Sequence, residues 1–320
     1  MKIKSYIPLL CSILLIGSMI EAADIFGSRE IIFPEIAAIA TGALLTPKLV
    51  WCTDYLRTFT AIALCAVLGL CIVLWLPGAV WFQMSIAYLL ASALFMTSGT
   101  SFAPMISAAV LPVLLQTDTI IYPIAACVLT AIILLLRFML VKNGILEDQS
   151  FEKLPQPDTS ICIQTFARWL IASAVIFIAL KLGVRYAAAP PLLVAFTEFW
   201  KPETVSRKRP TAVITLITLC AVSGAGIRFV LTEWLFVPAC VSAALTVIAV
   251  YFIMMKIGLM LPPASAIAIL AFLIPKEALL LFPVQIMLGI SVFVGASYLY
   301  RGKAFREMAA FRTMFQHLVR

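Results

Sequence analysis

Apolar segments follow one another along almost the whole chain, and the short polar stretches between them hold most of the charge. A soluble domain is about half apolar and about a quarter charged, whereas here 63% of the 320 residues are hydrophobic and only 12% are charged. Too few polar residues remain to cover a water-exposed surface, so the sequence predicts an integral protein of the lipid bilayer. Twelve apolar segments can be counted, near residues 6–21, 31–46, 58–76, 79–97, 103–116, 119–141, 162–181, 187–200, 210–231, 235–255, 261–275 and 279–299.

Spaced patterns in the first half of the chain recur in the second half in the same order. This order predicts an all-α, polytopic helical membrane protein built from two six-element tandem repeats, a common construction of transporters. The repeats are residues 1–141 and 161–300, joined by a polar cytoplasmic linker at 142–160 and followed by a tail at 301–320. The matching patterns are "LCAVLG" at 64–69 and "LCAVSG" at 219–224, Pro34 with Thr41 and Pro190 with Thr197, Pro47 and Pro202, Pro104-x-x-Ser107-Ala108 and Pro262-x-x-Ser265-Ala266, and "IYPI" at 121–124 and "LFPV" at 281–284.

Within each repeat the second and fifth elements are short and begin with proline. Proline is tolerated in the first turn of a helix, where its missing N–H would have no partner. Pro262 and Pro263, which precede a run without charge or glycine, are therefore predicted to start a helix rather than to break one. The third, fourth and sixth elements approach the roughly 20 residues that cross a bilayer.

The basic residues predict the orientation in the membrane. If the N-terminus is cytoplasmic and all twelve elements cross, 18 of the 23 Lys and Arg residues fall on the cytoplasmic side, a strong positive-inside bias. We therefore expect twelve crossings of a cell inner membrane, parallel repeats, and both termini in the cytoplasm. The first segment also has the composition of a cleavable signal peptide, but its counterpart at 162–181 favours a retained helix.

The tail at 301–320 has a different pattern. Phe305, Met308, Phe311 and Phe315 follow helical spacing among several basic residues. This pattern predicts an amphipathic helix on the anionic inner leaflet, with a frayed helix end as the alternative.

The second half resembles the HPP family of integral membrane proteins. The resemblance is carried by "PPLLVAFTEF", the proline-punctuated basic loop, "LPPASAIAIL" and "FPVQIMLGISVFVGASYLYR", and in the first half by "FPEIAAIATGALLTP" and "APMISAAVLPVLL". Some members of that family are linked to nitrite transport, so the resemblance implies a small anion. The histidine that gives the family its name is absent, because Leu261 precedes the two prolines and Phe102-Ala103 precede Pro104.

The proline-started elements are the candidate substrate site. Backbone N–H groups at a helix start within the membrane attract an anion, and hydroxyl groups one turn further would add donors. The alternative is that the prolines mark helix starts at the surface and that the small residues after them permit close packing. The candidate residues are Thr41, Pro104, Ser107, Thr197, Arg228, Pro262, Pro263 and Ser265.

Ionisable residues in apolar segments usually mark a pathway or a pair. Arg228 follows "SGAG" and is the leading candidate for a positive charge at one mouth of a path, with pairing to Glu233 as the alternative. Glu198 is expected at the membrane–water interface. Arg137 and Arg168 are expected to anchor their helices at the cytoplasmic side of the membrane.

Catalytic and metal-binding motifs are absent from the sequence, and the one histidine, His317, lies in the tail. We therefore expect no enzymatic activity, no cofactor, no metal and no nucleic-acid partner. The sequence favours a transporter or channel for a small anion, which could be a homo-oligomer. An exporter component for organic or aromatic acids and a non-transporting membrane scaffold are the alternatives.

Overall fold

The computed structural model describes residues 6–155, 157–200 and 204–318, and for residue 205 and residues 301–318 it describes the backbone only. All regular structure in these ranges is helical. The α-helices are α1 (Ile7–Phe26), α2 (Glu35–Ala43), α3 (Tyr55–Trp75), α4 (Val80–Thr97), α5 (Pro104–Leu115), α6 (Ile121–Lys142), α7 (Thr159–Lys181), α8 (Pro190–Trp200), α9 (Val205–Lys208), α10 (Pro210–Ile227), α11 (Ala239–Ile257), α12 (Pro262–Leu270) and α13 (Phe282–Leu318). Four short segments complete them: η2 (Arg29–Ile31), η3 (Arg185–Ala188) and η5 (Lys276–Ala278) are 3₁₀ helices, and η4 (Arg228–Trp234) is a π-helix that continues α10.

Eight helices in the described part of the chain are long and apolar enough to cross a membrane. The apolar elements α2, α5, α8 and α12 have only 9 to 12 residues, or about 14–18 Å at 1.5 Å per residue. The hydrocarbon core of a bilayer is about 30 Å thick, so a short helix alone covers about half of it. Eight of the twelve predicted elements thus have the length of a membrane helix. The eight are α1, α3, α4, α6, α7, α10 with η4, α11 and the first 19 residues of α13.

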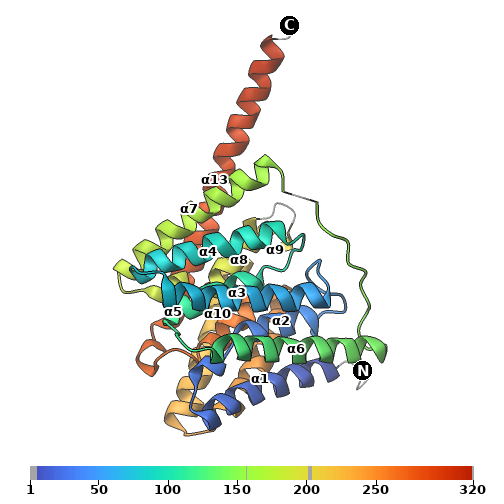
Figure 1. Ribbon diagram of the computed structural model, residues 1–320, viewed down its shortest axis with the longest axis vertical. Coiled ribbons are helices and arrows are strands. Elements are labelled where there is room, and N and C mark those ends of the chain that lie inside the picture. Colours follow the sequence, from blue (N-terminus) through green and yellow to red (C-terminus); the bar gives the residue numbers. More distant parts are fainter. Residues whose placement is uncertain (1–5, 156, 201–203, 319–320) are drawn as a thin grey trace.

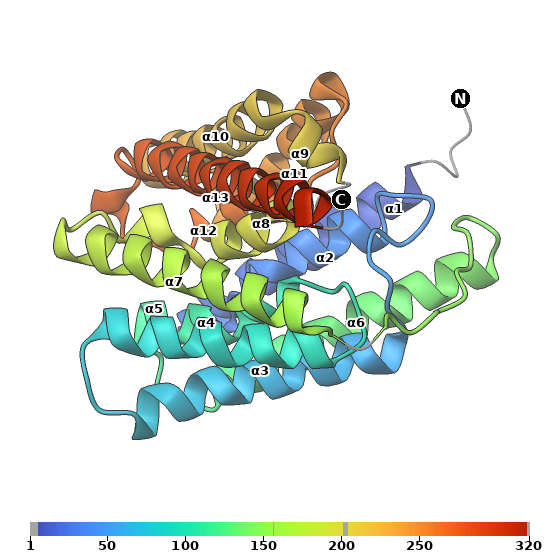
Figure 2. The ribbon, with the colours of Figure 1, turned by 90° about the horizontal axis from the view of Figure 1, so that it is seen from above.

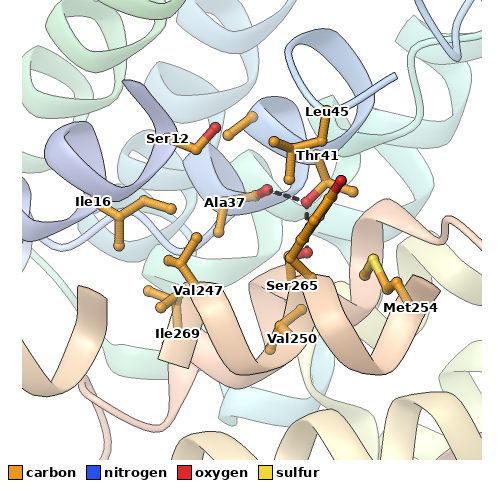
Figure 3. Close-up of a pocket in the computed structure, with 12 residues that line it drawn as sticks. Ser12, Ile16, Ala37, Thr41, Leu45, Val247, Val250, Met254, Ser265 and Ile269 are labelled. Carbon is orange, nitrogen blue, oxygen red and sulfur yellow. Dashed lines mark hydrogen bonds between the residues drawn. The ribbon is translucent and has the colours of Figure 1, made fainter. Parts of the chain in front are cut away.

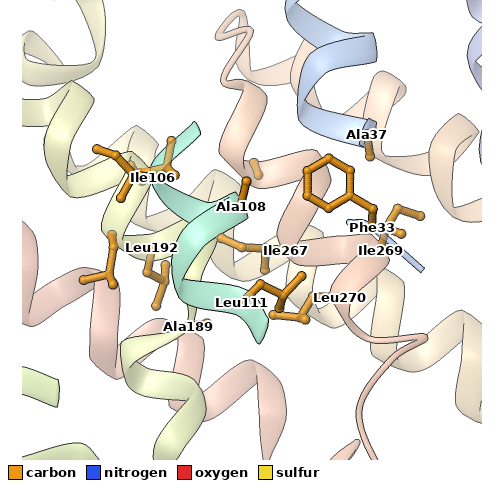
Figure 4. Packing of buried hydrophobic residues seen from close by; sticks show 14 of the residues in the cluster. Phe33, Ala37, Ile106, Ala108, Leu111, Ala189, Leu192, Ile267, Ile269 and Leu270 are labelled. Atoms are coloured by element: carbon orange, nitrogen blue, oxygen red, sulfur yellow. The ribbon is translucent and has the colours of Figure 1, made fainter. Parts of the chain in front are cut away.

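The four short helices α2, α5, α8 and α12 form the centre of the molecule and are here called the central layer. Every residue of α2 and α12 is buried, as are all but one residue each of α5 and α8. In Figure 2 they lie between α3, α4 and α6 at one side and α10, α11 and α13 at the other. Figure 4 shows how closely their aliphatic side chains pack: Leu111 of α5 lies against Leu270 of α12, and Leu192 of α8 lies near Ile106.

The helix starts follow the local sequence. Proline occupies the first turn of α5, α10 and α12, and α8 begins at Pro190. The prediction that Pro262 and Pro263 start a helix is therefore confirmed. Aspartates start two of the long helices, because the side chain of Asp54 accepts from the backbone N–H of Arg57 and that of Asp158 from Ile161, both at 2.7 Å.

The helices exchange partners between the two halves of the chain. The first helix of the chain, α1, packs against α11 in the second half, and α7 packs against α4 in the first. Among the short helices, α2 packs against α12 and α5 against α8. Each half is therefore completed by helices of the other, and α1 is an integral part of the packing.

Two glycines let long helices approach short ones closely. A Cβ atom on Gly69 of α3 would overlap the carbonyl oxygen of Ala109 in α5, and one on Gly224 of α10 would overlap that of Ala268 in α12. These are the final glycines of "LCAVLG" and "LCAVSG". Small residues of this kind are what helix contacts in a membrane require, because lipid supplies no hydrophobic force between helices.

The loops gather at two ends of the helix bundle. At one end, here called the basic end, the backbone N–H of Ser101 donates to Cys52 O at 3.0 Å and that of Leu154 donates to Gly99 O at 2.9 Å. The connection between α6 and α7 runs along this end (Figure 1). Trp51 Nε1 donates to Glu198 Oε1 at 3.0 Å. This hydrogen bond connects the loops of the first half at the basic end to helix α8 of the second half. The opposite end holds η2, η3 and the segments after α5 and α12.

The helix α13 continues as a backbone helix to Leu318 and extends beyond the bundle (Figure 1). The side chains of 301–320 lie outside the described residues. The amphipathic face of the tail therefore stays a prediction.

Candidate functional site

Two of the predicted site residues meet at the centre of the molecule. Thr41 Oγ1 on α2 and Ser265 Oγ on α12 lie 2.6 Å apart, and the Thr41 hydroxyl also lies 2.9 Å from Ala37 O in its own helix (Figure 3). Both residues are buried. The two residues belong to short elements of different halves, and this hydrogen bond joins the halves at the centre.

Ser107 has a different partner, a buried carboxyl group. Its hydroxyl donates to Oε1 of Glu35, the first residue of α2. Glu35 is 1% exposed, and its Oε2 has no hydrogen-bond partner among the described residues. A carboxylate without a cation is costly in such surroundings. Glu35 is thus the fully buried acidic residue of the four short helices, and the sequence analysis did not single it out.

Thr197 bonds within its own half and to a long helix of the other. Its hydroxyl donates to Leu193 O at 2.9 Å and lies 3.1 Å from the hydroxyl of Tyr88 in α4. Both side chains are fully buried. Thr197 therefore joins α8 of the second half to Tyr88 of the first half.

The centre is closed in this structure. Thr41 and Ser265 line a cavity of about 10 Å³ between α1, α2, α11 and α12, room for at most one water molecule. Pro104, Pro262 and Pro263 are buried at the starts of α5 and α12. Packed side chains thus cover the helix starts that were predicted to bind an anion.

At the C-terminal end of each of the four short helices, a side chain donates to a backbone carbonyl group. The last carbonyls of a helix have no partner within it, and in a membrane interior water does not replace them. Arg137 donates to Ala43 O at the end of α2, and Gln116 donates to Val113 O near the end of α5 at 2.8 Å. Arg207 donates to Phe199 O at the end of α8 at 3.1 Å. The positive groups also complement the negative end of the helix dipole.

Arg228 has the same role at the end of α12, which differs from the expected role at a water-lined mouth. It is 8% exposed and donates to Ala271 O at 2.6 Å and to Ile274 O at 2.7 Å. Its other two nitrogen donors bond to Glu233 Oε1 at 2.9 and 3.1 Å. The alternative of pairing with Glu233 is the one that the structure bears out, and Arg228 presents no free positive charge.

The two predicted cytoplasmic anchors are also buried, Arg137 at 3% and Arg168 at 6% exposure. Arg137 is the α2 cap described above. Arg168 differs from every other buried arginine, because no hydrogen bond or ion pair joins it to any residue that the structure describes.

A tyrosine that sequence reasoning missed satisfies another carbonyl. Pro112 lies inside α5 and lacks the N–H that would bond to Ala108 O one turn earlier. The hydroxyl of Tyr122 donates to that oxygen at 2.8 Å. At the matching position of the second half, Leu270 replaces the proline and Phe282 replaces the tyrosine. The sequence therefore contained a clue to the Tyr122 contact, because the proline and the tyrosine occur together in the first half and are both replaced in the second.

Larger pockets lie at the two ends. At the opposite end, a pocket of about 260 Å³ is lined by Arg29, Arg185, Thr117 and Tyr122, with Glu30 and four apolar residues. At the basic end, one pocket of about 140 Å³ lies beside Trp51 and Arg137, and one of about 350 Å³ lies beside Arg168 and Trp200. Within the described residues, no group of three or more His, Cys, Asp or Glu side chains could hold a metal ion.

The described helices define the class of protein: eight apolar helices of membrane length are those of a multi-pass membrane protein. No family model matches the chain, and no curated protein and no solved structure matches it. The resemblance to the HPP family therefore stays a prediction.

Proposed function

We propose that this chain is a secondary transporter or channel for a small anion, with a path along the interface of two homologous halves. The observation that carries the proposal is the pocket of about 260 Å³ at the opposite end. Two arginines line it, Arg29 from the 3₁₀ segment η2 and Arg185 from the 3₁₀ segment η3. Tyr122 also lines it and bonds to Ala108 O, next to Ser107. The pocket therefore leads from a positive rim toward the closed central layer.

The internal repeat is supported by paired packing. α3 packs against α5 and α6 as α10 packs against α12 and α13, and the exchanges α1 with α11 and α2 with α12 have the counterparts α7 with α4 and α8 with α5. Arg29 and Arg185 are separated by the same 156 residues as Pro34 and Pro190. In this proposal the two arginines are equivalent residues of the repeats, and they meet because the halves face each other.

The central layer would act as the gate. Thr41 with Ser265 and Thr197 with Tyr88 pair hydroxyl groups across contacts between the two halves. Breaking these two hydrogen bonds would make the hydroxyl groups available as donors to an anion. Glu35 would supply a proton-binding group, because its carboxyl group is buried between α2 and α5 and contacts Ser107.

The basic end would face the cytoplasm. Most Lys and Arg residues of the chain belong to its loops, to the helix ends beside them or to the tail, as the positive-inside rule requires. The short helices would complete their crossings together with their flanking segments, so that each of the twelve elements leads from one end to the other. This arrangement agrees with parallel repeats, cytoplasmic termini and a location in the inner membrane.

Uptake into proteoliposomes tests the proposal, with nitrite, nitrate, formate and benzoate as solutes. We expect Arg29→Gln and Arg185→Gln each to raise the half-saturation concentration several-fold at low ionic strength, with a smaller effect at high salt. Ser265→Ala should weaken substrate binding by about 1 kcal/mol, the scale of one hydrogen bond. Lys276→Gln is the matched control, a cation of the same end beside Pro275 in the chain. If no anion moves, the transport proposal falls and the scaffold alternative takes its place.

A further inference from the structure

The pocket of about 350 Å³ at the basic end has a chemistry that the transport proposal does not use. Its walls come from α4, α7, the end of α8, and the chain on either side of residue 156. Most of the lining is apolar, with Phe95, Met96, Leu154 and Ile161 among the lining residues. The polar groups are fewer, and two of them are donors that lack an acceptor.

Arg168 and Trp200 supply these donors. Arg168 is 6% exposed and Trp200 is 4% exposed, so both side chains are more than nine-tenths buried. Arg168 Nε and Trp200 Nε1 have no hydrogen-bond partner among the described residues. A buried guanidinium group is costly unless an anion or several acceptors meet it.

The other two buried arginines, Arg137 and Arg228, have hydrogen-bond partners that Arg168 lacks. Arg137 and Arg228 each donate to carbonyl groups at the end of a short helix, and Arg228 also pairs with Glu233. Arg168 lies in the middle third of α7 and caps no helix. Its charge is therefore not explained by the architecture of the bundle.

We infer that the pocket beside Arg168 and Trp200 binds a monocarboxylate with an apolar body, a site distinct from the central layer and from the Arg29–Arg185 pocket. The guanidinium group offers the paired donors that match a carboxylate, and the indole N–H offers one more. The apolar walls would receive the hydrocarbon or aromatic part of the ligand, as in most small-molecule sites. An inorganic anion would leave those walls without a partner. This site goes beyond the proposed function, since binding here requires no transport.

Calorimetric titration of the purified full-length protein tests the inference, with benzoate and octanoate as probes and benzamide and chloride as comparisons. We expect both carboxylates to bind and both comparisons to bind at least tenfold more weakly. Arg168→Met should weaken benzoate binding about tenfold or more, because it removes the charge but keeps an apolar side chain of similar length. Trp200→Phe should weaken it by a smaller factor. Arg57→Met is the matched control, a cation of the same end that pairs with Asp54.

Thermal unfolding of the same variants separates binding from folding. Arg168→Met should unfold at an unchanged or higher temperature, since no bond to the described chain is lost. Lower stability in Arg168→Met would mean that the chain itself supplies the partner, and the inference would be overturned. Unchanged benzoate binding in Arg168→Met would also overturn it. So would an anionic lipid, detected by native mass spectrometry, that is lost in Arg168→Met while benzoate fails to bind.

Discussion

At the scale of single residues, most of the buried polar side chains discussed above donate hydrogen bonds to backbone carbonyl oxygens. Arg137, Arg207 and Arg228 donate to carbonyls at the ends of short helices, and Tyr122 donates to the carbonyl that Pro112 leaves without a partner. In a bilayer every backbone group must find its partner within the protein. Most of the charged side chains inside the bundle therefore stabilise helix ends. Glu35 and Arg168 do not have this role.

The Tyr122 contact gives a prediction about stability. Tyr122→Phe should lower the free energy of unfolding by about 1–3 kcal/mol, because Ala108 O becomes a buried acceptor without a donor. Pro112→Leu in the same chain should restore much of the loss, since the leucine N–H can donate to Ala108 O. Thermal unfolding in detergent measures both changes. Equal stability of Tyr122→Phe and the native protein would contradict the assignment.

Arg228 gives a second prediction. Arg228→Met should destabilise the protein by about 3–5 kcal/mol, the usual cost of breaking a buried ion pair on one side. The variant leaves Glu233 and the carbonyls of Ala271 and Ile274 without their donors. Adding Glu233→Gln should recover part of the loss, because the unpaired carboxylate is removed. The apparent melting temperature in detergent is the measurement, and a value above that of the native protein would refute the capping role.

At the scale of helices, the closest contacts are those of Gly69 with α5 and of Gly224 with α12. Replacing either glycine by leucine should strongly lower the yield of folded protein, because the backbones must separate to admit the side chain. Gly226→Ala is the matched control in the same helix, since a Cβ atom there meets nothing within 4 Å. Monodispersity on size-exclusion chromatography distinguishes the variants. A well-folded Gly224→Leu would show that α10 and α12 are not held at this distance.

The sequence predicted the elements better than their contacts. Apolar length and proline position were enough to locate the eight long apolar helices and the starts of α5, α8 and α12, because these depend on neighbouring residues. The partner of Arg137, Ala43, is 94 residues away in the sequence, and that of Arg228, Ala271, is 43 away. Such pairs depend on the positions of the helix ends in the tertiary structure, and a local sequence pattern does not predict these positions.

At the scale of the whole molecule, the orientation of the two ends is a testable consequence of the charge distribution. In a variant without native cysteines, Gln149→Cys at the basic end should react with a membrane-impermeant maleimide only after the cells are opened. Leu280→Cys, exposed at the opposite end, should react in intact cells. Labelling of residue 149 in intact cells would reverse the orientation and remove the positive-inside argument.

The two halves also differ at one chemically important position, which bears on energy coupling. Glu35 follows Pro34, whereas Pro191 follows Pro190 at the matching position. This pair of matching positions thus has one carboxyl group rather than two. The other acidic residue of the short helices, Glu198 near the end of α8, accepts a hydrogen bond from Trp51. A carrier that moves either as the empty carboxylate or with a proton on Glu35 and one bound anion carries the same charge in both states. The proposed transport would then be an electroneutral symport of one proton and one monovalent anion.

This coupling predicts how uptake responds to gradients and to the loss of Glu35. In proteoliposomes, an inwardly directed proton gradient should drive accumulation of the anion, whereas a potassium diffusion potential set with valinomycin should have little effect. Glu35→Gln should abolish accumulation driven by the proton gradient but retain exchange of labelled for unlabelled anion, because the amide can still accept a hydrogen bond from Ser107. Glu30→Gln, an exchange of the same kind in the pocket at the opposite end, should keep the proton-driven accumulation. If Glu35→Gln still accumulates the anion against its gradient, the proton must be carried elsewhere, and Glu35 has no part in coupling.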